Sequence, residues 1–568
     1  MNRMLLYVHY NKFNELSPHV LYQLEQLRPL FSSICFISNS QLTKEAIEKL
    51  QCEHLVNNLI QRQNEGYDFA AWKEGILSLF DEIKTFDSLT LMNDTCFGPL
   101  WNMQPIFDKF ESDDTVDFWG LTNHAACQIR GGSYVAEHLQ SYFLSFKSQV
   151  IKSKVFSEFW SEVESLSNVQ QVIDSYESKL TEKLVNFGFH YQSLLNLSQK
   201  PELGNVSIFR PDLVVQSGIP FVKIKAFSHA SHIAPFVLRE IEEKSDYPSG
   251  LIISHLSAIL VPGEPFLLPY KSLKNCDNIT EETSKVTLVH LHFSTLNGLE
   301  ILNKFFNNNQ FELIVSASSE ELLRSLKITL QKQENITIFK FVIIRSITDW
   351  QKFVNDSILN LNQCCLAYIH VSDFFSNQLI DYWSLEELID IMLKSEKEVN
   401  QAFLSDEKLG LGIPDLVSYE RYKNNQLVFE NEKKIFEKIG ISELELTNPM
   451  LKRSLSAYWI RTEVLQKVLR YNNDLSISDF EKMLPIINWK ERFDFVLLPN
   501  KQNIPALIDA NKVEKMLLAS ELEVPDSINY PVSAKLVLRF FKKATLLTLN
   551  YFLKRLNIIK LVKEKYNK

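Results

Sequence analysis

Short apolar runs alternate with amphipathic stretches along the first part of the chain. Residues 5–10, 33–38, 56–60 and 88–92 form apolar runs with the length and composition of buried strands. In the stretches between them apolar residues recur at helical spacing, and Ser17-Pro18 opens the first of these stretches as proline often opens a helix. Strands that alternate with helices predict a mainly parallel, doubly wound α/β sheet.

Further strand-like runs follow at residues 117–122 and 138–146. A helical pattern then extends over residues 168–187, and Gly188 comes directly after it as a typical C-terminal cap. Prolines and polar clusters mark residues 246–285 as a connecting segment.

From residue 286 onward, the order of strands and helices echoes the start of the chain. This weak repeat predicts two copies of one fold, the alternative being chance similarity between α/β patterns. The second copy lacks the glycine-containing loop of the first and displaces its Asp373, so we expect it to be degenerate in chemistry. Its predicted elements are strands at 286–293 and 311–316, a helix at 299–306, a strand and loop at 341–350, and a strand at 366–373.

These patterns divide the chain into four parts. We expect a first α/β domain at residues 1–245, a connection at 246–285, a second domain at 286–475 and a helical extension at 476–568. The length of 568 residues supports more than one domain, because a domain usually has ~100–200 residues.

Cysteine usage and the absence of leader-like segments predict a cytoplasmic protein. The seven cysteines show no metal-ligand spacing and no disulfide framework, which favours reduced thiols. The first ten residues lack a signal-peptide cleavage site, and no apolar run approaches the ~20 residues that span a bilayer.

Charge is distributed unevenly. The net charge is −9, yet residues 533–568 contain ten Lys or Arg and one acid, which leaves 50 basic and 68 acidic residues upstream. Apolar residues interleave with these cations, so the segment predicts a basic amphipathic helix on an anionic membrane surface. The alternative is a helix docked on the acidic body. That acidic body argues against a nucleic-acid partner.

Polar loops follow the third and fourth predicted strands, at residues 64–75 and 91–100. The carboxyl ends of parallel strands share one edge of a sheet, which is where open α/β folds bind ligands. An activated, phosphate-bearing substrate would suit this edge, which points towards sugar transfer. The candidate ligand-binding residues in the two loops are Asn64, Gly66, Asp68, Asn93 and Asp94.

Each of these residues has a functional and a structural interpretation. Asp94 is the candidate to hold Mg²⁺ or Mn²⁺ against phosphate oxygens, but it would also serve as an Asx cap on the turn before Pro99. Gly66 would permit close backbone approach to phosphate or ribose. Asp68 would accept a hydrogen bond from a sugar hydroxyl, or simply complement a helix dipole. A single carboxylate at Asp94 leaves metal dependence open.

Glu177 is the candidate general base. It shares the apolar stripe of its predicted helix with Leu180 and Leu184. A carboxylate on such a stripe is costly unless it faces a cleft or a partner, and partial burial raises its pKa towards the range a base needs. The alternative is a helix-edge glutamate paired with Lys179, Lys183 or a distant arginine. Asp117 is the rival base.

Four segments, taken in order, resemble the rhamnan synthesis protein F family, bacterial proteins that help to build rhamnose-rich cell-wall polysaccharide. The resemblance covers residues 1–245 strongly and the second copy only loosely. The segments are Asn64-Glu-Gly-Tyr-Asp-Phe-Ala-Ala-Trp-Lys, Met92-Asn-Asp-Thr-Cys-Phe-Gly-Pro, Asp117-Phe-Trp-Gly-Leu-Thr and His138-Leu-Gln-Ser-Tyr-Phe.

This resemblance implies a GT-A glycosyltransferase fold for the first domain and a degenerate GT-A-like fold for the second. Asn93-Asp94-Thr95 occupies the place of an Asp-x-Asp motif, and Glu177 matches the acid that acts as base in related inverting enzymes. On the same grounds, Trp119 is implied on the donor side of the site, and His138 and Gln140 are implied on the acceptor side.

The implied activity is inverting transfer of rhamnose from dTDP-L-rhamnose to a lipid-linked rhamnan acceptor. The enzyme would attach peripherally to the inner face of the plasma membrane, in reach of other polysaccharide-synthesis enzymes. The alternative is a non-catalytic, glycan-binding scaffold subunit of the assembly machinery, because the Asp-x-Asp pattern is incomplete and the second copy is degenerate.

Overall fold

The structure is a computed structural model. The chain divides into two compact units, Met1–Asn503 and Ile504–Lys568, and every residue described below belongs to the first. The structure describes residues 1–128, 134–273, 287–296, 311–330, 337–361, 364–371, 389–414, 419–421, 440, 449–451, 457–471 and 476–499.

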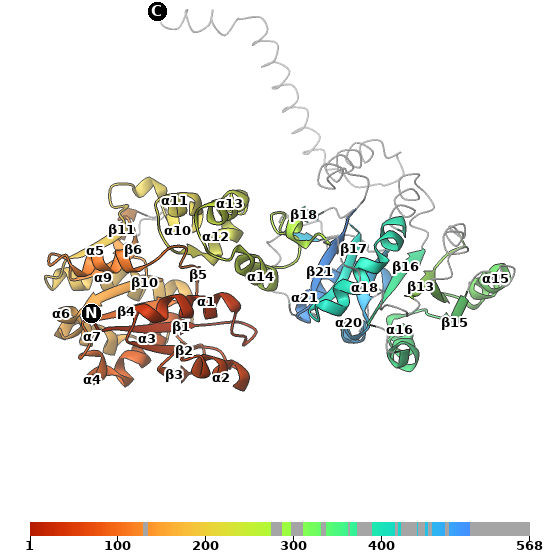
Figure 1. The fold of residues 1–568 in the computed structure, drawn as a ribbon, viewed down its shortest axis with the longest axis horizontal. Coiled ribbons are helices and arrows are strands. Elements are labelled where there is room, and N and C mark those ends of the chain that lie inside the picture. The colour runs from red at the N-terminus through yellow and green to blue at the C-terminus, as the bar shows by residue number, and fades with distance from the viewer. Residues whose placement is uncertain are drawn as a thin grey trace, which may run out of the picture. The chain divides into compact units, whose positions relative to one another are not determined.

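The first part of the chain is built on one large mixed sheet (Figure 1). Its strands lie in the order β11-β6-β10-β4-β1-β2-β3. All run in the same direction except β10, which is antiparallel to both of its neighbours. The strands are β1 (Arg3–His9), β2 (Ser33–Ser38), β3 (Asn58–Gln61), β4 (Ser88–Asn93), β6 (Phe118–His124), β10 (Phe143–Lys147) and β11 (Tyr191–Leu195).

Helices cover both faces of this sheet, and each face has its own apolar core. Consecutive residues of β1 alternate between the cores, because side chains along a strand point to opposite faces: Tyr7 lies in one core and Leu6 in the other. The helices are α1 (Pro18–Leu27), α2 (Lys44–Cys52), α3 (Tyr67–Ser78), α4 (Phe80–Ile83), α5 (Gln104–Glu111), α6 (Ser148–Ile151), α7 (Lys154–Glu162), α8 (Val169–Val172), α9 (Ser178–Asn186), α10 (Val206–Phe209), α11 (Pro211–Gln216), α12 (Ile224–His229), α13 (Ala234–Lys244) and α14 (Ser249–Ile259).

The second sheet repeats the strand order and the strand directions of the first. Its strands lie in the order β15-β14-β13-β16-β20-β17-β21, and only β20 runs against its neighbours. Small hairpins aside, both sheets therefore have the order 3-2-1-4-6-5-7, which confirms the predicted internal repeat. The strands are β13 (Thr287–Phe293), β14 (Phe311–Ala317), β15 (Thr337–Ile343), β16 (Cys365–Val371), β17 (Leu409–Pro414), β20 (Ala457–Arg461) and β21 (Asp494–Leu498).

The second sheet extends past the predicted domain boundary at residue 475, because β21 pairs in parallel with β17. Its described helices are α15 (Glu320–Leu330), α16 (Ile347–Phe353), α18 (Glu396–Ser405), α20 (Thr462–Val468) and α21 (Ile477–Lys490). Nowhere in the described part of the chain does a helix combine the length and apolarity needed to cross a membrane.

Two predicted elements of the first domain are interrupted in the structure. The predicted strand 138–146 is split into β9 (His138–Leu139) and β10, because the chain turns at residues 140–142. The predicted helix 168–187 contains a π-helical turn over Ile173–Glu177. The predicted helix at 299–306, Asp373 and the basic segment 533–568 lie outside the described residues.

Candidate functional site

The loops after β3 and β4 meet at the carboxyl edge of the first sheet, as the parallel strand pattern predicts. The β3 loop ends at Gly66, which has a φ of +72° and begins α3. A Cβ at this position would lie 2.6 Å from the Ala70 Cβ and 2.7 Å from the Ser165 Cα. Glycine is therefore required both for the backbone angle and for the close packing. Asn64, in the same loop, is exposed.

Asn93 connects this loop to the end of β4. Its side-chain amide donates a 2.7 Å hydrogen bond to Asp68, and its Oδ1 accepts from the Thr95 hydroxyl at 2.6 Å. Burial raises the pKa of Asp68 to about 6, although the hydrogen bond from Asn93 opposes the rise. Asp68 is thus a carboxylate held in place and poised to change its charge near neutral pH.

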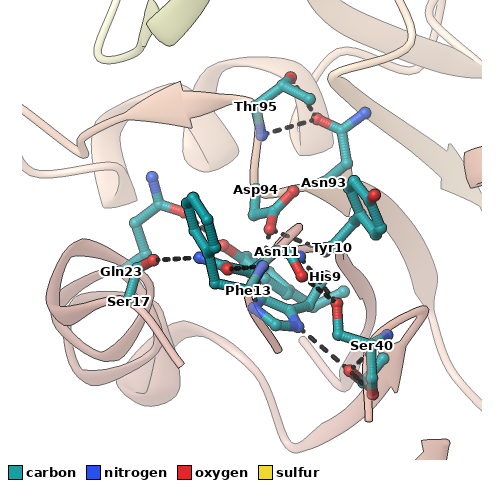
Figure 2. A network of polar contacts seen from close by, with 12 residues as sticks. His9, Tyr10, Asn11, Phe13, Ser17, Gln23, Ser40, Asn93, Asp94 and Thr95 are labelled. Atoms are coloured by element: carbon teal, nitrogen blue, oxygen red, sulfur yellow. Dashed lines mark hydrogen bonds and ion pairs between the residues drawn. The ribbon is translucent and has the colours of Figure 1, made fainter. Parts of the chain in front are cut away.

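Asp94 lies at the end of β4, beside the end of β1. Its Oδ2 accepts a 2.8 Å hydrogen bond from the backbone N–H of Tyr10 (Figure 2). Burial raises the pKa of Asp94 to about 8, with a further contribution from the charge of Asp68. His9 Nε2 lies 4.0 Å from the same carboxylate oxygen, but burial lowers the pKa of His9 to about 4, so the ring is neutral at pH 7.

Glu177 reaches the same edge from the π-helical turn that precedes α9. Its Oε1 accepts two hydrogen bonds of 2.9 Å, from the backbone N–H and the hydroxyl of Ser141. Its negative charge raises the pKa of Asp68, which shows that the two carboxylates lie close enough to interact. A π-helical turn is rare and often marks a functional site.

The alternative interpretation of Glu177 as a lysine-paired surface residue does not hold. Lys179 pairs with Glu182, and Lys183 pairs with Glu162. The hydrogen bonds to Ser141 instead orient the Glu177 carboxylate towards the loop between β9 and β10.

Lys223 also belongs to this site, and the sequence patterns did not indicate it. It lies in β12 (Val222–Lys223), which pairs antiparallel with β5 (Cys96–Phe97) so that Lys223 is opposite Cys96. Its Nζ lies 5.3 Å from the centre of the Tyr142 ring, and its charge lowers the pKa of Asp68. The strand pairing that sets Lys223 opposite Cys96 joins segments far apart in sequence, so no local motif could have revealed it.

Two predicted site residues lie elsewhere. Trp119 is 1% exposed and stacks on Phe110 with ring centroids 4.6 Å apart, so it is part of the core and does not contact a donor. Asp117 precedes β6, at the sheet edge opposite the site, where it accepts hydrogen bonds from the His190 N–H and the Gln149 amide. Its level in the sheet is near that of Ser88, about 20 Å from Asp94 at ~3.3 Å per strand residue. Asp117 is thus excluded as the base of this site.

The two residues predicted on the acceptor side are mostly buried. Gln140 accepts from the Thr122 hydroxyl at 2.7 Å and donates to Asn205 at 3.1 Å, so it holds the loop that carries Ser141 and is not free to reach an acceptor. His138 stacks on His124, and the charge of Glu177 acts on its pKa, which burial lowers. The charge of Glu177 therefore reaches the His138 ring, which is buried and packs against His124.

The donor set of this site is sparse for a divalent cation. Asn93 uses its oxygen on Thr95 and its amide on Asp68, which leaves Asp94 as the carboxylate best placed for a metal. Within the described ranges, no group of three or more His, Cys, Asp or Glu side chains is arranged to hold a metal ion. Mg²⁺ usually takes one or two protein carboxylates together with substrate phosphates. Asp94 would supply one carboxylate, the smaller of these two numbers.

The second sheet carries different chemistry at the equivalent positions. His9 Nδ1 lies 3.1 Å from Ser38 Oγ in the first sheet, and His292 Nδ1 lies 2.8 Å from Ser316 Oγ in the second. With these pairs aligned, the strand register places Ile369 where the first copy has Asn93, and His370 where it has Asp94.

The residue of the second copy that corresponds to Glu177 is Glu481, and another side chain of the protein binds its carboxylate. Glu177 precedes the first residue of β11 by 14 positions, and Glu481 precedes the first residue of β21 by 13. Glu481 is 1% exposed, and both of its carboxylate oxygens lie 2.9 Å from His370 Nδ1. In the second copy a buried His–Glu pair thus stands where the first copy has Asp94 and Glu177.

Comparison with known proteins gives a family and several distant similarities. The model of the family described as rhamnan synthesis protein F matches residues 34–485. An uncharacterized protein, y4gN, of Sinorhizobium fredii is 29% identical over 174 residues, a match that covers 30% of this chain and 43% of the length of that relative.

Solved structures of glycosyltransferases are among the distant similarities. GlyE of Streptococcus pneumoniae is 14% identical with a TM-score of 0.23, covering 70% of this chain and 91% of that one. A glycosyltransferase involved in glycosylation of the major capsid of PBCV-1 is 13% identical with a TM-score of 0.22, covering 43% and 98%. Similarity at these TM-scores supports no inference about function.

Proposed function

We propose that this chain, which belongs to the rhamnan synthesis protein F family, is a glycosyltransferase with a GT-A type first domain that adds rhamnose to a growing polysaccharide. The proposed donor is dTDP-L-rhamnose and the proposed acceptor is a lipid-linked rhamnan. Asp68, Asn93 and Asp94 would line the donor side of the site, and Glu177 would face the acceptor.

The position of Glu177 is the observation that carries the proposal. Its carboxylate is fixed through Oε1 by both polar groups of Ser141, which leaves Oε2 to receive a proton. It also lies within electrostatic reach of Asp68, so a base and a donor-binding carboxylate share one edge of the sheet. General-base catalysis requires this kind of fixed, partly buried carboxylate next to the substrate.

The proposed reaction is a single displacement with inversion at the anomeric carbon. The acceptor hydroxyl oxygen forms a bond to that carbon while the bond from the carbon to the diphosphate oxygen breaks. The hydroxyl proton passes to Glu177, and the electron pair of the broken bond leaves with dTDP. Asp68 would hold a hydroxyl of the sugar or of the ribose during this step. No covalent enzyme intermediate is needed, so one base suffices.

The second domain would have a non-catalytic role. Ile369 and His370 stand in the places of Asn93 and Asp94, and Glu481 is bound to His370, so among the described residues the equivalent edge does not repeat the carboxylates of the first domain. This observation favours a glycan-binding or scaffold role for the second half of the chain, next to a catalytic first half.

Membrane attachment is part of the proposal and depends on residues 533–568, which lie outside the described part of the chain. Their ten basic residues would bind anionic lipid at about 1 kcal/mol each near the surface. Deleting residues 533–568 should abolish binding to vesicles that contain phosphatidylglycerol. Undiminished binding by the shortened chain would show that these residues do not attach the protein to the membrane.

The Glu177→Gln variant tests the activity. Glutamine keeps an oxygen for the hydrogen bonds from Ser141 but cannot take a proton, so we expect transfer from dTDP-rhamnose to a lipid-linked acceptor to fall about 10²–10⁴-fold with the fold intact. Glu182→Gln is the matched control, because Glu182 is an exposed residue of α9 that pairs with Lys179. Full transfer by Glu177→Gln would rule out Glu177 as the base.

A further inference from the structure

Lys223 is a partly buried cation that lacks an anionic partner. Among the described residues, no acidic side chain lies within ion-pair distance of its ammonium group, which lies 5.3 Å from the centre of the Tyr142 ring. The side chain is half-buried, and its cation–π contact with Tyr142 contributes only about 0.5–2 kcal/mol, so it leaves the ammonium group free to bind more strongly to an anion. The Lys223 side chain is therefore placed to receive an anion.

Its surroundings identify where that anion would lie. Lys223 is opposite Cys96 in the β5–β12 pair, and the Ile224 N–H donates to the Thr95 carbonyl at 2.9 Å. The lysine is thus tied to the segment that directly follows Asp94. The Tyr142 ring faces the ammonium group of Lys223. Tyr142 directly follows Ser141, whose backbone N–H and hydroxyl donate hydrogen bonds to Glu177. Lys223 consequently lies between the end of β4 and the loop that holds the proposed base.

The charge balance of the site calls for such a cation. Asp68, Asp94 and Glu177 bring three carboxyl groups to this edge of the sheet, and Lys223 is the cation that the β5–β12 pair adds to them. A diphosphate would add further negative charge. The donor set for a divalent metal is sparse, whereas Lys223 brings a cationic side chain to the same edge of the sheet.

We infer that Lys223 binds the diphosphate of the nucleotide sugar and serves as the fixed cation that neutralises the leaving group. This inference rests on the proposed function, since it assumes a nucleoside diphosphate in the site. During transfer, negative charge grows on the diphosphate oxygen as the bond to the sugar breaks. A positioned ammonium group stabilises this charge more in the transition state than in the ground state, which is the condition for catalysis.

Calorimetric titration of the full-length chain with dTDP and with thymidine tests the inference. We expect the wild-type chain to bind dTDP in the presence of EDTA, and Lys223→Gln to bind it at least ten-fold more weakly with unchanged affinity for thymidine. Lys223→Arg should recover most of the dTDP affinity because it keeps the charge. Lys225→Gln is the matched control, since Lys225 is an exposed lysine two residues further along.

The outcomes separate the inference from the proposed function. If the wild-type chain binds dTDP and Lys223→Gln binds it equally well, the inference is wrong while the proposed function stands. If wild-type binding of dTDP disappears in EDTA, a metal ion and not Lys223 neutralises the diphosphate, and the inference is again wrong. If the wild-type chain binds no nucleoside diphosphate with or without Mn²⁺, both the inference and the proposed function fail.

Discussion

The Asn93 amide donates a 2.7 Å hydrogen bond to the Asp68 carboxylate and so joins the loop after β4 to the first turn of α3. These two residues come from separate polar loops, and the contact converts two independent sequence features into one site. Asn93 is 3% exposed, so its amide is held inside the protein, where water cannot replace Asp68 as its hydrogen-bond partner.

Replacing Asn93 by Ala should shift the pH dependence of donor binding. The amide hydrogen bond lowers the pKa of Asp68, which is about 6, so its loss should move that pKa upward. If ionised Asp68 accepts a hydroxyl of the donor, the midpoint below which dTDP-rhamnose binding weakens will rise. We also expect a loss of about 1 kcal/mol in the free energy of unfolding. Asn186→Ala, at an exposed position of α9, is the control, and an unchanged midpoint in Asn93→Ala would contradict the prediction.

Asp94→Asn should remove a pH-dependent loss of stability. The folded-state pKa of Asp94 is about 8 and its unfolded value is near 3.9, so between about pH 4 and pH 8 the folded chain keeps a proton that the unfolded chain has lost. Raising the pH through this window therefore destabilises the wild type. From pH 5 to pH 9 we expect the wild type to lose at least about 1 kcal/mol more than Asp94→Asn, measured by urea unfolding. Equal losses in both proteins would show that Asp94 is ionised throughout.

Asp117→Asn should leave sugar transfer unchanged. Asp117 lies at the opposite edge of the sheet from Asp94 and accepts hydrogen bonds from His190 and Gln149, so its role is structural. We expect a stability loss of about 1 kcal/mol in thermal unfolding, without a change in kcat. Loss of transfer comparable to that of Glu177→Gln would restore Asp117 as a candidate base.

His370→Ala should strongly destabilise the second domain. It removes the partner of Glu481, a carboxyl group that is 1% exposed and whose pKa burial raises. Loss of one member of such a pair costs about 3–5 kcal/mol, because it leaves the other buried and unpaired. The double variant with Glu481→Gln should be more stable than His370→Ala alone in urea unfolding. If the double variant is no more stable than His370→Ala, the two side chains do not contribute to stability as a pair.

Periodicity predicted the sheets, their repeat and the meeting of Asp68, Asn93 and Asp94. Apolar runs of strand length predicted the positions of the strands. Parallel strands bring their carboxyl ends to one edge of the sheet, whatever packs around them. Glu177 was predicted from the cost of placing a carboxylate on an apolar stripe, and the structure gives it the polar partner Ser141.

The antiparallel direction of β10 and the side of the sheet that each side chain faces were decided only by the tertiary structure. Asp117 and Trp119 are two positions apart in one motif, yet Trp119 packs into a core and Asp117 lies at the edge opposite the site, because β6 runs parallel to β4 through the intervening antiparallel β10. Lys223 and the His370–Glu481 pair likewise depend on contacts between distant segments. The spacing of apolar residues is a local property that can be read from the sequence. The register between paired strands depends on residues far apart in the chain, which only folding brings together.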